Sequence, residues 1–551
     1  MTEHADKPVL EVADLAVATG GPGAKPILRG VSFDIRAGET MCLVGESGSG
    51  KSVTSLATMG LLPPRLLQVT RGAIRLDGTD LTGVSPAQMR ALRGNRMAMI
   101  FQEPMTALNP VMSIGAQIDE SLRTHATLSA SARRTRVLDA LDQVRLPDVA
   151  RIHDSFPHQL SGGQRQRAMI AMALVLEPRL LIADEPTTAL DVTTQAQILT
   201  LIRDLQAQHG TAVLFITHDM GVVLDIADRV CVMRAGEIVE TGPVREVLSR
   251  PQAGYTRDLL SAVPSLLPRP PRRETRAKPV LEVTGLRKVY GGRGGLSRLW
   301  RPARETVAVD GVEFTLRAGR TLGVVGESGS GKSTLARCVM RLVDPSGGAI
   351  RVCGQHVGEL SAQALKPHRK RIQMIFQDPN RSLNPRMTIG RSLVEGPVNY
   401  GAPFGHSWER AQDLLELVGL PADAINRFPH QFSGGQRQRI AIARALIMEP
   451  EVLVADEAVS ALDVSVQAQV LRLLDDIQTR LGVAILFITH DLRVAAQICD
   501  DILVMKAGRM VEYGPTAQVL GQPRADYTRS LMEAAPGRHW DFAAFAPRAS
   551  A

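Results

Sequence analysis

The stretch Gly45-Glu46-Ser47-Gly48-Ser49-Gly50-Lys51-Ser52 decides the fold of this chain. Its pattern is G-x-x-x-x-G-K-S, and it stands between an apolar run, Thr40–Val44, and a helix-forming stretch, Val53–Met59. A strand, a glycine-rich loop and a helix in this order predict a phosphate-binding loop, because glycines let backbone N–H groups turn towards a phosphate. In such a loop Lys51 reaches the terminal phosphates, and the Ser52 hydroxyl can ligate Mg²⁺.

The same eight residues occur again as Gly326-Glu327-Ser328-Gly329-Ser330-Gly331-Lys332-Ser333, at an offset of 332 − 51 = 281. Other stretches recur at similar offsets: Lys7–Val12 returns as Lys278–Val283 (278 − 7 = 271), and Phe156–Arg167 returns as Phe428–Arg439 (428 − 156 = 272). A repeat of this length means that two halves share one fold. The repetition also argues against a chance glycine-rich turn.

Each half alternates apolar strands with helical segments. Leu180–Ala183 and Ala212–Thr217 are typical of buried strands, and Val192–Gln208 is typical of a helix. This alternation predicts an α/β fold with a mostly parallel sheet covered by helices. Over residues 111–178 and 387–450 helical periodicity replaces the strand signals, so we expect a helical subdomain inserted into each core.

Composition limits the classes of site. The five cysteines have no C-x-x-C spacing, which argues against a zinc site and a disulfide framework. The net charge of 64 − 56 = +8 is weak support for nucleic-acid binding; a solvated basic surface is favoured, with a membrane-facing surface as the alternative. No stretch of about 18 apolar residues occurs and the N-terminus does not resemble a signal peptide, so we expect a cytoplasmic protein.

Four segments are expected from the repeat and from local composition: a first domain (1–263), an extended Pro- and Arg-rich linker (264–279), a second domain (280–535) and a C-terminal tail (536–551). The tail is expected to fray, although Trp540, Phe542 and Phe545 indicate that part of it docks. A basic loop, 291–304, is interpreted as a solvated surface, with a lipid-headgroup contact as the alternative.

Two carboxylates end a buried strand in each half. Leu180–Ala183 is followed by Asp184 and Glu185, and the same pair returns as Asp456 and Glu457. The first acid of each pair is placed to hold the Mg²⁺ shell and the second to polarise an attacking water, since phosphoryl transfer depends on positioning and charge neutralisation. The alternative, an acidic cap of the next helix, is less favoured beside a phosphate loop.

Four further repeated motifs carry a family resemblance. They are Ser161-Gly162-Gly163-Gln164 with Ser433-Gly434-Gly435-Gln436, Gln102 with Gln377 after apolar runs, Ala189-Leu190-Asp191 with Ala461-Leu462-Asp463, and His218 with His490 after strand ends. This set resembles the nucleotide-binding subunit of an ATP-binding cassette (ABC) transporter, in which these are the signature, Q-loop, D-loop and switch-histidine motifs. The resemblance covers both halves and nearly the whole chain.

The resemblance implies two tandem P-loop NTPase (RecA-like) cassettes, joined head to tail around two ATP molecules. Lys51 would then work with Ser433, and Lys332 with Ser161. The implied catalytic residues are Glu185, His218, Glu457 and His490, and the implied Mg²⁺ ligands are Ser52, Gln102, Asp184, Ser333, Gln377 and Asp456. The implied ATP-binding residues are the two phosphate loops, both Q-loop glutamines, both signatures, Asp191, Asp463 and Tyr290.

A narrower resemblance follows each Q-loop. Residues 102–110 and 377–385 look like the oligopeptide, dipeptide and nickel importer group. That group implies an ATPase at the cytoplasmic face of the inner membrane, peripheral to two transmembrane permease subunits, and through them a substrate-binding protein. It implies no nucleic acid and no direct contact with the solute. Because the segments that follow the two cassettes after Tyr255 and Tyr527 contain no cysteine, we expect no iron–sulfur cluster, which members of the group often carry there.

Two questions remain open on the sequence. The rival function is a soluble cassette ATPase acting on ribosomes or DNA, but the long charged linkers and zinc cysteines of such proteins are missing. The imported solute is also open among peptide, glutathione, opine and nickel, with peptide favoured.

One asymmetry between the halves is expected. With the 271 offset, Tyr290 aligns with Thr19 (290 − 271 = 19). In this family an aromatic residue at that place stacks on adenine, and Thr19 offers no ring. We therefore expect weaker ATP binding at the Lys51 site, unless loop 19–26 bends differently or another side chain covers the base.

Overall fold

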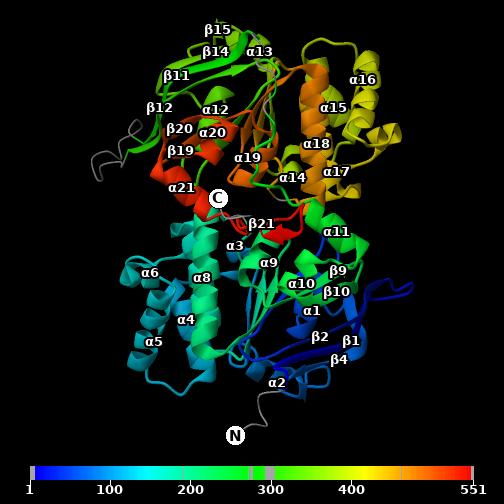
Figure 1. Ribbon diagram of the computed structural model, residues 1–551, viewed down its shortest axis with the longest axis vertical. Helices are drawn as coiled ribbons and strands as arrows, with labels where there is room; N and C mark the ends of the chain where they lie inside the picture. Colours follow the sequence, from blue (N-terminus) through cyan, green and yellow to red (C-terminus); the bar gives the residue numbers. More distant parts are fainter. Residues whose placement is uncertain are drawn as a thin grey trace. The chain divides into compact units, whose positions relative to one another are not determined.

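The computed structural model describes residues 7–188, 190–270, 272, 277–291, 305–460 and 462–547. The chain divides into two compact units (Figure 1). Unit 1 comprises Met1–Leu190, Thr194–Val263 and Pro536–Ala551, and unit 2 comprises Asp191–Thr193 and Pro264–Ala535. The chain therefore passes into unit 2 at Pro264 and returns to unit 1 at Pro536.

A six-stranded sheet forms the centre of unit 1, in the order β10-β9-β3-β8-β7-β6. Its inner strands are parallel and fully buried apolar runs, as strands covered on both faces must be, and only β10 runs antiparallel to its neighbour. The strands are β3 (Thr40–Val44), β6 (Met97–Ile100), β7 (Leu180–Asp184), β8 (Ala212–Ile216), β9 (Arg229–Arg234) and β10 (Glu237–Pro243).

A separate antiparallel sheet, in the order β2-β1-β4-β5, adds a layer to unit 1 that the sequence analysis did not predict. Buried and exposed residues nearly alternate along it, because one face packs inward and the other meets solvent. Leu10 and Leu15 of this sheet share a hydrophobic core with Leu43 and Leu214 of the parallel sheet. The strands are β1 (Leu10–Thr19), β2 (Pro26–Ile35), β4 (Leu67–Leu76) and β5 (Thr79–Asp80).

The helical insertion predicted between residues 111 and 178 is present in unit 1. It contains α4 (Ile114–His125), α5 (Ala130–Gln143), α6 (Val149–Asp154), the 3-10 turn η1 (Pro157–Gln159) and α7 (Gly162–Leu174). The remaining helices are α1 (Lys51–Thr58), α2 (Pro86–Leu92), α3 (Pro104–Ala107), α8 (Val192–His209), α9 (Met220–Ile226), α10 (Val244–Ser249) and α11 (Gly254–Ser261).

Unit 2 repeats this architecture, as the offsets predicted. Its parallel sheet has the order β16-β17-β18-β13-β19-β20 and its antiparallel sheet the order β12-β11-β14-β15. The strands are β11 (Pro279–Tyr290), β12 (Thr306–Arg317), β13 (Thr321–Val325), β14 (Gly347–Val352), β15 (Gln355–His356), β16 (Ile372–Ile375), β17 (Val452–Asp456), β18 (Ala484–Ile488), β19 (Asp501–Lys506) and β20 (Arg509–Pro515).

The helices of unit 2 also match those of unit 1 in order. The insertion contains α15 (Ile389–Asn399), α16 (Phe404–Leu417), η3 (Ala422–Asn426), η4 (Pro429–Gln431) and α17 (Gly434–Leu446). The others are α12 (Lys332–Val339), α13 (Ala362–Arg369), α14 (Pro379–Ser382), α18 (Val464–Leu481), α19 (Leu492–Ile498), α20 (Thr516–Gly521) and α21 (Asp526–Glu533). Among the described residues, no helix is both long and apolar enough to cross a bilayer.

Two expectations about the connecting segments were wrong. The first part of the linker is not merely extended, because Leu266 is buried in the hydrophobic core of unit 2. The tail does not fray over 536–547, where β21 (Trp540–Asp541) pairs with β22 (Ala546–Pro547). The accompanying expectation that part of the tail docks is confirmed, because Trp540 and Phe542 are buried. Aromatic burial outweighs the Ala/Pro composition on which the expectation of fraying rested. Loop 292–304 lies outside the described residues.

Candidate functional site

The phosphate loop of each unit joins the end of a buried strand to the start of a helix, as predicted. In unit 1 it connects β3 to α1, with Gly50 as the helix N-cap at φ 106°. Gly45 has φ 148°, and a Cβ there would lie 2.2 Å from the Met233 carbonyl oxygen. No other residue type fits this position, because the backbone is left-handed and the neighbouring strand approaches too closely. Gly326 repeats the arrangement against the Met505 carbonyl oxygen.

The lysine of each loop lies inside the loop. The Lys51 Nζ donates to the carbonyl oxygens of Gly45 at 2.7 Å and Glu46 at 2.8 Å. The Lys332 Nζ makes the equivalent bonds at 2.7 Å each. Burial lowers the pKa of Lys332, although neighbouring acids oppose the shift. Each ammonium also bonds a serine hydroxyl of its loop, Ser49 or Ser330, at 3.5 Å. A buried ammonium bonded to neutral oxygens can exchange them for the charged oxygens of a phosphate.

A hydroxyl and a buried carboxylate meet beside the loop. Ser52 Oγ donates to Asp184 Oδ1 at 3.2 Å, and Ser333 Oγ donates to Asp456 Oδ1 at the same distance. Burial raises the pKa of the Asp184 carboxyl to about 6, with the Ser52 hydrogen bond opposing the shift. Burial likewise raises the pKa of Asp456.

The second acid of each pair is in contact with the Q-loop glutamine and the switch histidine of its own unit. In unit 1, Gln102 Nε2 donates to Glu185 Oε2 at 2.9 Å, and His218 Nδ1 lies 3.2 Å from Oε1. Thr188 Oγ1 also donates to Oε2, at 3.0 Å. Glu185 has φ 47°, an uncommon conformation for a residue with a side chain. Such strain is typical of sites where the surroundings fix a functional side chain.

Unit 2 reproduces this cluster. Gln377 Nε2 donates to Glu457 Oε2 at 2.7 Å, His490 Nδ1 lies 3.4 Å from Oε1, and Glu457 has φ 46°. These contacts use the whole carboxylate, so the alternative that the acid caps the next helix is not supported. That role in unit 2 belongs to Asp463, whose side chain accepts from the Val466 N–H at the start of α18.

Each histidine and glutamate stabilise one another's charged forms. Burial acts to raise the pKa of Glu185, but the hydrogen bond and charge of His218 outweigh it and the pKa is lowered overall. Burial acts to lower the pKa of His218, but Glu185 outweighs it and that pKa is raised overall. The Glu457–His490 pair behaves in the same way. The glutamate is therefore ionised and able to orient a water near neutral pH.

The signature motifs start the long helices of the insertions. Ser161 caps α7: its Oγ accepts from the Gln164 N–H at 3.3 Å, and Gln164 Oε1 accepts from the Ser161 N–H at 3.0 Å. Ser433 and Gln436 form the same reciprocal cap on α17. The amino ends of both helices carry a partial positive charge, which is favourable for a nearby phosphate.

Both phosphate loops, both helical insertions and the Gln–Glu–His clusters occur twice in one chain, and family models match accordingly. The model described as "ABC transporter" matches residues 28–188 and 309–460. The chain belongs to the ABC transporter family. A second model, "Oligopeptide/dipeptide transporter, C-terminal region", matches residues 239–292 and 511–541, so each ABC cassette is followed by this region.

Curated relatives match nearly the whole chain. A peptidoglycan transport ATP-binding protein, YejF of Agrobacterium fabrum, is 48% identical over 97% of this chain and 98% of its own length. The glutathione import ATP-binding protein GsiA of Salmonella choleraesuis is 48% identical over 96% of this chain and 89% of its own length. GsiA of Escherichia coli O157:H7 is 50% identical over 92% of this chain and 86% of its own length.

These matches confirm four predictions: the family and its peptide-importer group, the tandem P-loop fold, the ATPase activity class and the repeated cassettes. They favour the importer over the rival acting on ribosomes or DNA. The structure places Thr19 and Tyr290 at the same position, the last residue of the first strand of each ABC cassette. Tyr290 is 39% exposed, as a residue awaiting a ligand can be.

A tyrosine that the sequence analysis did not assign contacts each phosphate loop. Tyr255, on α11, accepts from the Glu46 N–H through its hydroxyl at 3.2 Å. Tyr527, on α21, accepts from the Glu327 N–H at 3.1 Å. Burial raises the pKa of Tyr527 to about 12. The repeated Tyr-Thr-Arg at 255–257 and 527–529 was the available signal.

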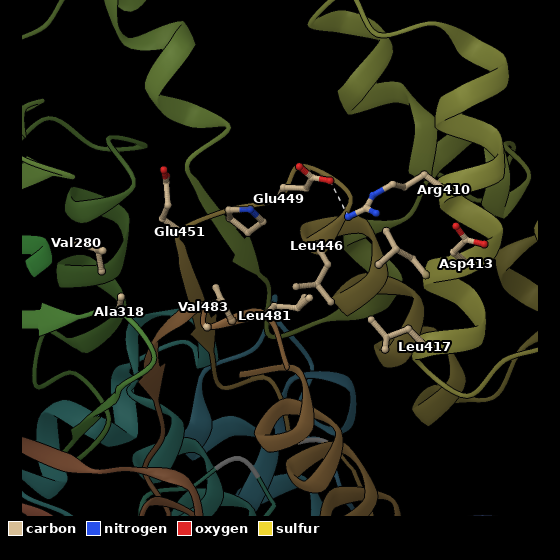
Figure 2. A pocket seen from close by; sticks show the side chains of 13 residues that line it. Val280, Ala318, Arg410, Asp413, Leu417, Leu446, Glu449, Glu451, Leu481 and Val483 are labelled. Carbon is tan, nitrogen blue, oxygen red and sulfur yellow. Dashed lines mark ion pairs between the residues drawn. The ribbon is translucent and has the colours of Figure 1, made fainter. Parts of the chain in front are cut away.

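A pocket of about 540 Å³ in unit 2 is separate from this site (Figure 2). Arg410 of α16 and Glu449 form an ion pair on one side, at 2.7 Å. Glu451 and Val483 line the other side and precede β17 and β18, whereas the nucleotide-site acids follow the opposite end of β17. Ligands of open α/β sheets bind at the carboxyl ends of the strands, so we do not assign nucleotide to this pocket.

Proposed function

We propose that this chain is the ATP-hydrolysing subunit that powers import of a peptide or peptide-like solute through two membrane permease subunits. The observation that carries the proposal is the match to import and transport ATP-binding proteins over more than nine-tenths of the chain. The oligopeptide/dipeptide transporter region after each cassette supports a peptide-type solute. The chain would lie at the cytoplasmic face of the inner membrane, and a substrate-binding protein would deliver the solute to the permeases.

The hydrolytic roles follow from the contacts within each cassette. The loop and Lys51 or Lys332 would hold the phosphates of ATP, and Glu185 or Glu457 would orient the attacking water. His218 or His490 would hold that carboxylate in place and balance its negative charge. Gln102 or Gln377 would move when the occupancy of the site changes. Positioning and charge neutralisation are the main demands of phosphoryl transfer.

Mg²⁺ is the metal that fits the donor set. The residues that would hold it are Ser52 with Asp184 and Ser333 with Asp456. The Q-loop glutamines bond the neighbouring acids, Glu185 and Glu457. Hydroxyl and carboxylate oxygens suit Mg²⁺, which needs only one or two protein carboxylates because substrate phosphates and waters complete its shell. When bound, the ion neutralises charge on the phosphates. We propose no iron–sulfur cluster, since the segments that follow the cassettes after Tyr255 and Tyr527 contain no cysteine.

The two signatures would complete the sites of the opposite cassettes. In the head-to-tail arrangement Ser433 joins the Lys51 site and Ser161 joins the Lys332 site, with Asp191 and Asp463 between them. Capped helix amino ends attract anions, which supports this role for α7 and α17. The chain itself would contact neither the solute nor nucleic acid.

The permease would dock where the helical insertion meets the core, next to the Q-loop. In unit 2 a groove of about 540 Å³ is lined by residues that follow Gln377 and α14 in the chain, such as Asn384 and Met387. Arg444 of α17 also lines it. Its walls come from the α14–α15 connection, α15 and α17. A partner helix seated there would feel any movement of Gln377 that ATP causes.

The function is tested by reconstitution. The chain, a candidate permease pair and the binding protein are placed in proteoliposomes with ATP inside, and uptake of labelled dipeptide, oligopeptide, glutathione and Ni²⁺ is compared. We expect ATP-dependent uptake of a peptide-type solute, which the Glu185→Gln/Glu457→Gln protein does not support. Failure to bind any permease, together with copurification of ribosomes or DNA, would overturn the proposal.

A further inference from the structure

The chain leaves each cassette at the same position and enters the other unit. The part of unit 1 that contains the first cassette ends at Val263, and the corresponding part of unit 2 ends at Ala535. The difference, 535 − 263 = 272, is the offset of the repeat. The residues that follow the first cassette, 264–272, belong to unit 2. The residues that follow the second, 536–547, belong to unit 1. We name these the first and the second crossing segment.

The first crossing segment packs on α19 of unit 2. Gln497 Nε2, on α19, donates to the Ser265 carbonyl oxygen at 2.9 Å, and the Arg269 N–H donates to the Ala496 carbonyl oxygen at 3.0 Å. Leu266 is only 7% exposed and belongs to the core of unit 2. The Arg269 guanidinium donates to Asp475 of α18 at 2.8 Å. Apolar burial, backbone bonds and charge therefore all fix this segment.

The second crossing segment packs on α9 of unit 1, the counterpart of α19 (Figure 1). The Gly537 N–H donates to Asp225 Oδ2 at 3.1 Å. Gly537 has φ 64°, and a Cβ there would lie 2.7 Å from the Gly221 Cα, so the two backbones meet without a side chain between them. Trp540 and Phe542 are 7% and 5% exposed.

The two contacts are equivalent but use opposite chemistry. Asp225 and Gln497 occupy the same position (497 − 225 = 272), as do Ser265 and Gly537 (537 − 265 = 272). In unit 2 the helix side chain donates to a carbonyl oxygen, and in unit 1 the helix side chain accepts from an N–H. The side chain at this helix position therefore meets the backbone of the crossing segment in both units, as a donor in unit 2 and as an acceptor in unit 1.

Each crossing segment also connects two functional elements. It starts directly after the helix that holds Tyr255 or Tyr527 against a phosphate loop. It ends on the helix that begins two residues after His218 or His490. We propose that the crossing segments are reciprocal clasps: α9 and α19 are docking surfaces for the segment that follows the other cassette, and the clasps restrain the helices after the switch histidines. The proposal goes beyond the transport function and does not depend on the solute.

Hydrogen exchange of the full-length chain, followed by mass spectrometry, tests the clasps. In the wild-type protein, peptides covering 264–270 and 536–542 should exchange slowly. Gly537→Val places a side chain against the Gly221 backbone. Overpacking of this kind should speed exchange over 536–542 and over α9 by about 5- to 150-fold. Leu266→Asp should do the same for 264–270 and α19, because it buries a charge.

Matched controls separate docking from general damage. Ala543→Val adds a branched side chain to the same tail at an exposed position, and Leu267→Asp changes the exposed neighbour of Leu266. Neither should alter exchange, and β3 and β13 should remain protected in every variant. Equal effects of core and control changes, wild-type segments that exchange like free peptide, or protection that disappears on dilution would each overturn the proposal.

Discussion

The two candidate nucleotide sites of this chain have the same contacts at the proposed reacting groups and different contacts around them. The Lys, Ser–Asp and Gln–Glu contacts of the two units match within 0.2 Å. The surroundings differ: Ser55 donates to Asp184 at 3.5 Å, where Ala336 stands in unit 2 (336 − 55 = 281). Thr188 bonds the Glu185 carboxylate, whereas Ser460 bonds the backbone oxygen of Glu457. The proposed reacting groups are therefore duplicated, whereas the residues that hold them in place differ between the units.

The largest expected effect is common to both sites. Glu185→Gln/Glu457→Gln should lower ATP hydrolysis by about 10²- to 10⁴-fold, because the group that orients and deprotonates the water is lost. ATP binding, measured with a fluorescent analogue, should survive. The two single variants then show how much each site contributes. Glu103→Gln changes an exposed acid next to Gln102 and should hydrolyse ATP normally; a fully active double variant would contradict the assignment.

Acidity should affect the Lys51 site by about tenfold. Because the pKa of Asp184 is about 6, roughly a tenth of this group is ionised at about pH 5. In Lys332→Ala protein, Mg²⁺-dependent nucleotide binding should therefore fall about tenfold between neutral pH and pH 5. Asp184→Asn in the same background removes this carboxyl, so the part of the pH dependence that Asp184 contributes should disappear. A wild-type site that is equally strong at both pH values would refute the proposed metal role.

The same group has a predictable effect on stability. The folded pKa of Asp184 lies above the value of 3.8 expected for an unfolded chain, so the folded protein binds this proton more tightly. The contribution favours folding at low pH and is lost as pH rises from about 4 to 6. Asp184→Asn should remove that part of the pH dependence of the unfolding free energy, as followed by urea denaturation.

A smaller and symmetric effect should come from the loop-contacting tyrosines. Tyr255→Phe and Tyr527→Phe each leave a loop N–H without its partner, which costs about 1 kcal/mol, or about fivefold in ATP affinity at that site. Calorimetry on proteins with one functional lysine measures each site separately. Tyr290→Phe keeps its ring and should bind ATP like the wild type; tyrosine variants with unaltered affinity would mean that α11 and α21 do not support the loops.

The smallest effect should expose the asymmetry between the sites. Tyr290→Ala should weaken ATP binding at the Lys332 site by a factor of about two to ten, because aromatic stacking contributes about 0.5–1.5 kcal/mol. The Lys332→Ala protein, which keeps only the Thr19 site, should start out weaker than the Lys51→Ala protein. Equal affinities at the two sites, unaffected by Tyr290→Ala, would show that adenine is held in another way.

The sequence predicted those parts of the site that depend on local order. A loop between a strand and a helix, and acids at the end of a buried strand, can be placed from their neighbours because parallel strands end at one edge of a sheet. Gln102 and His218 were assigned to the site only through the family resemblance. That both contact Glu185 is seen only in the structure. The local backbone reason, a left-handed Glu185, cannot be read from residue type.

Long-range contacts account for what was missed. Tyr255 reaches Glu46 across 209 residues. The repeated Tyr-Thr-Arg marks the tyrosine but does not indicate which loop it contacts. The fraying of the tail was wrongly expected for the same reason. Composition describes an isolated chain, whereas Trp540 and Phe542 are buried and Gly537 bonds Asp225, 312 residues away. The antiparallel sheet was overlooked because its half-buried alternation was weaker than the apolar runs of the parallel sheet.

The second crossing segment also sets an order for folding during synthesis. Asp225 and Gly537, which bond in unit 1, are 312 residues apart. At about 5–20 residues per second, a ribosome needs about 15 to 60 seconds to make the chain between them. Throughout that interval no tail covers the surface of α9. The first crossing segment likewise cannot dock until α19 has been made. Unit 1 can therefore be completed only after the second crossing segment has been made.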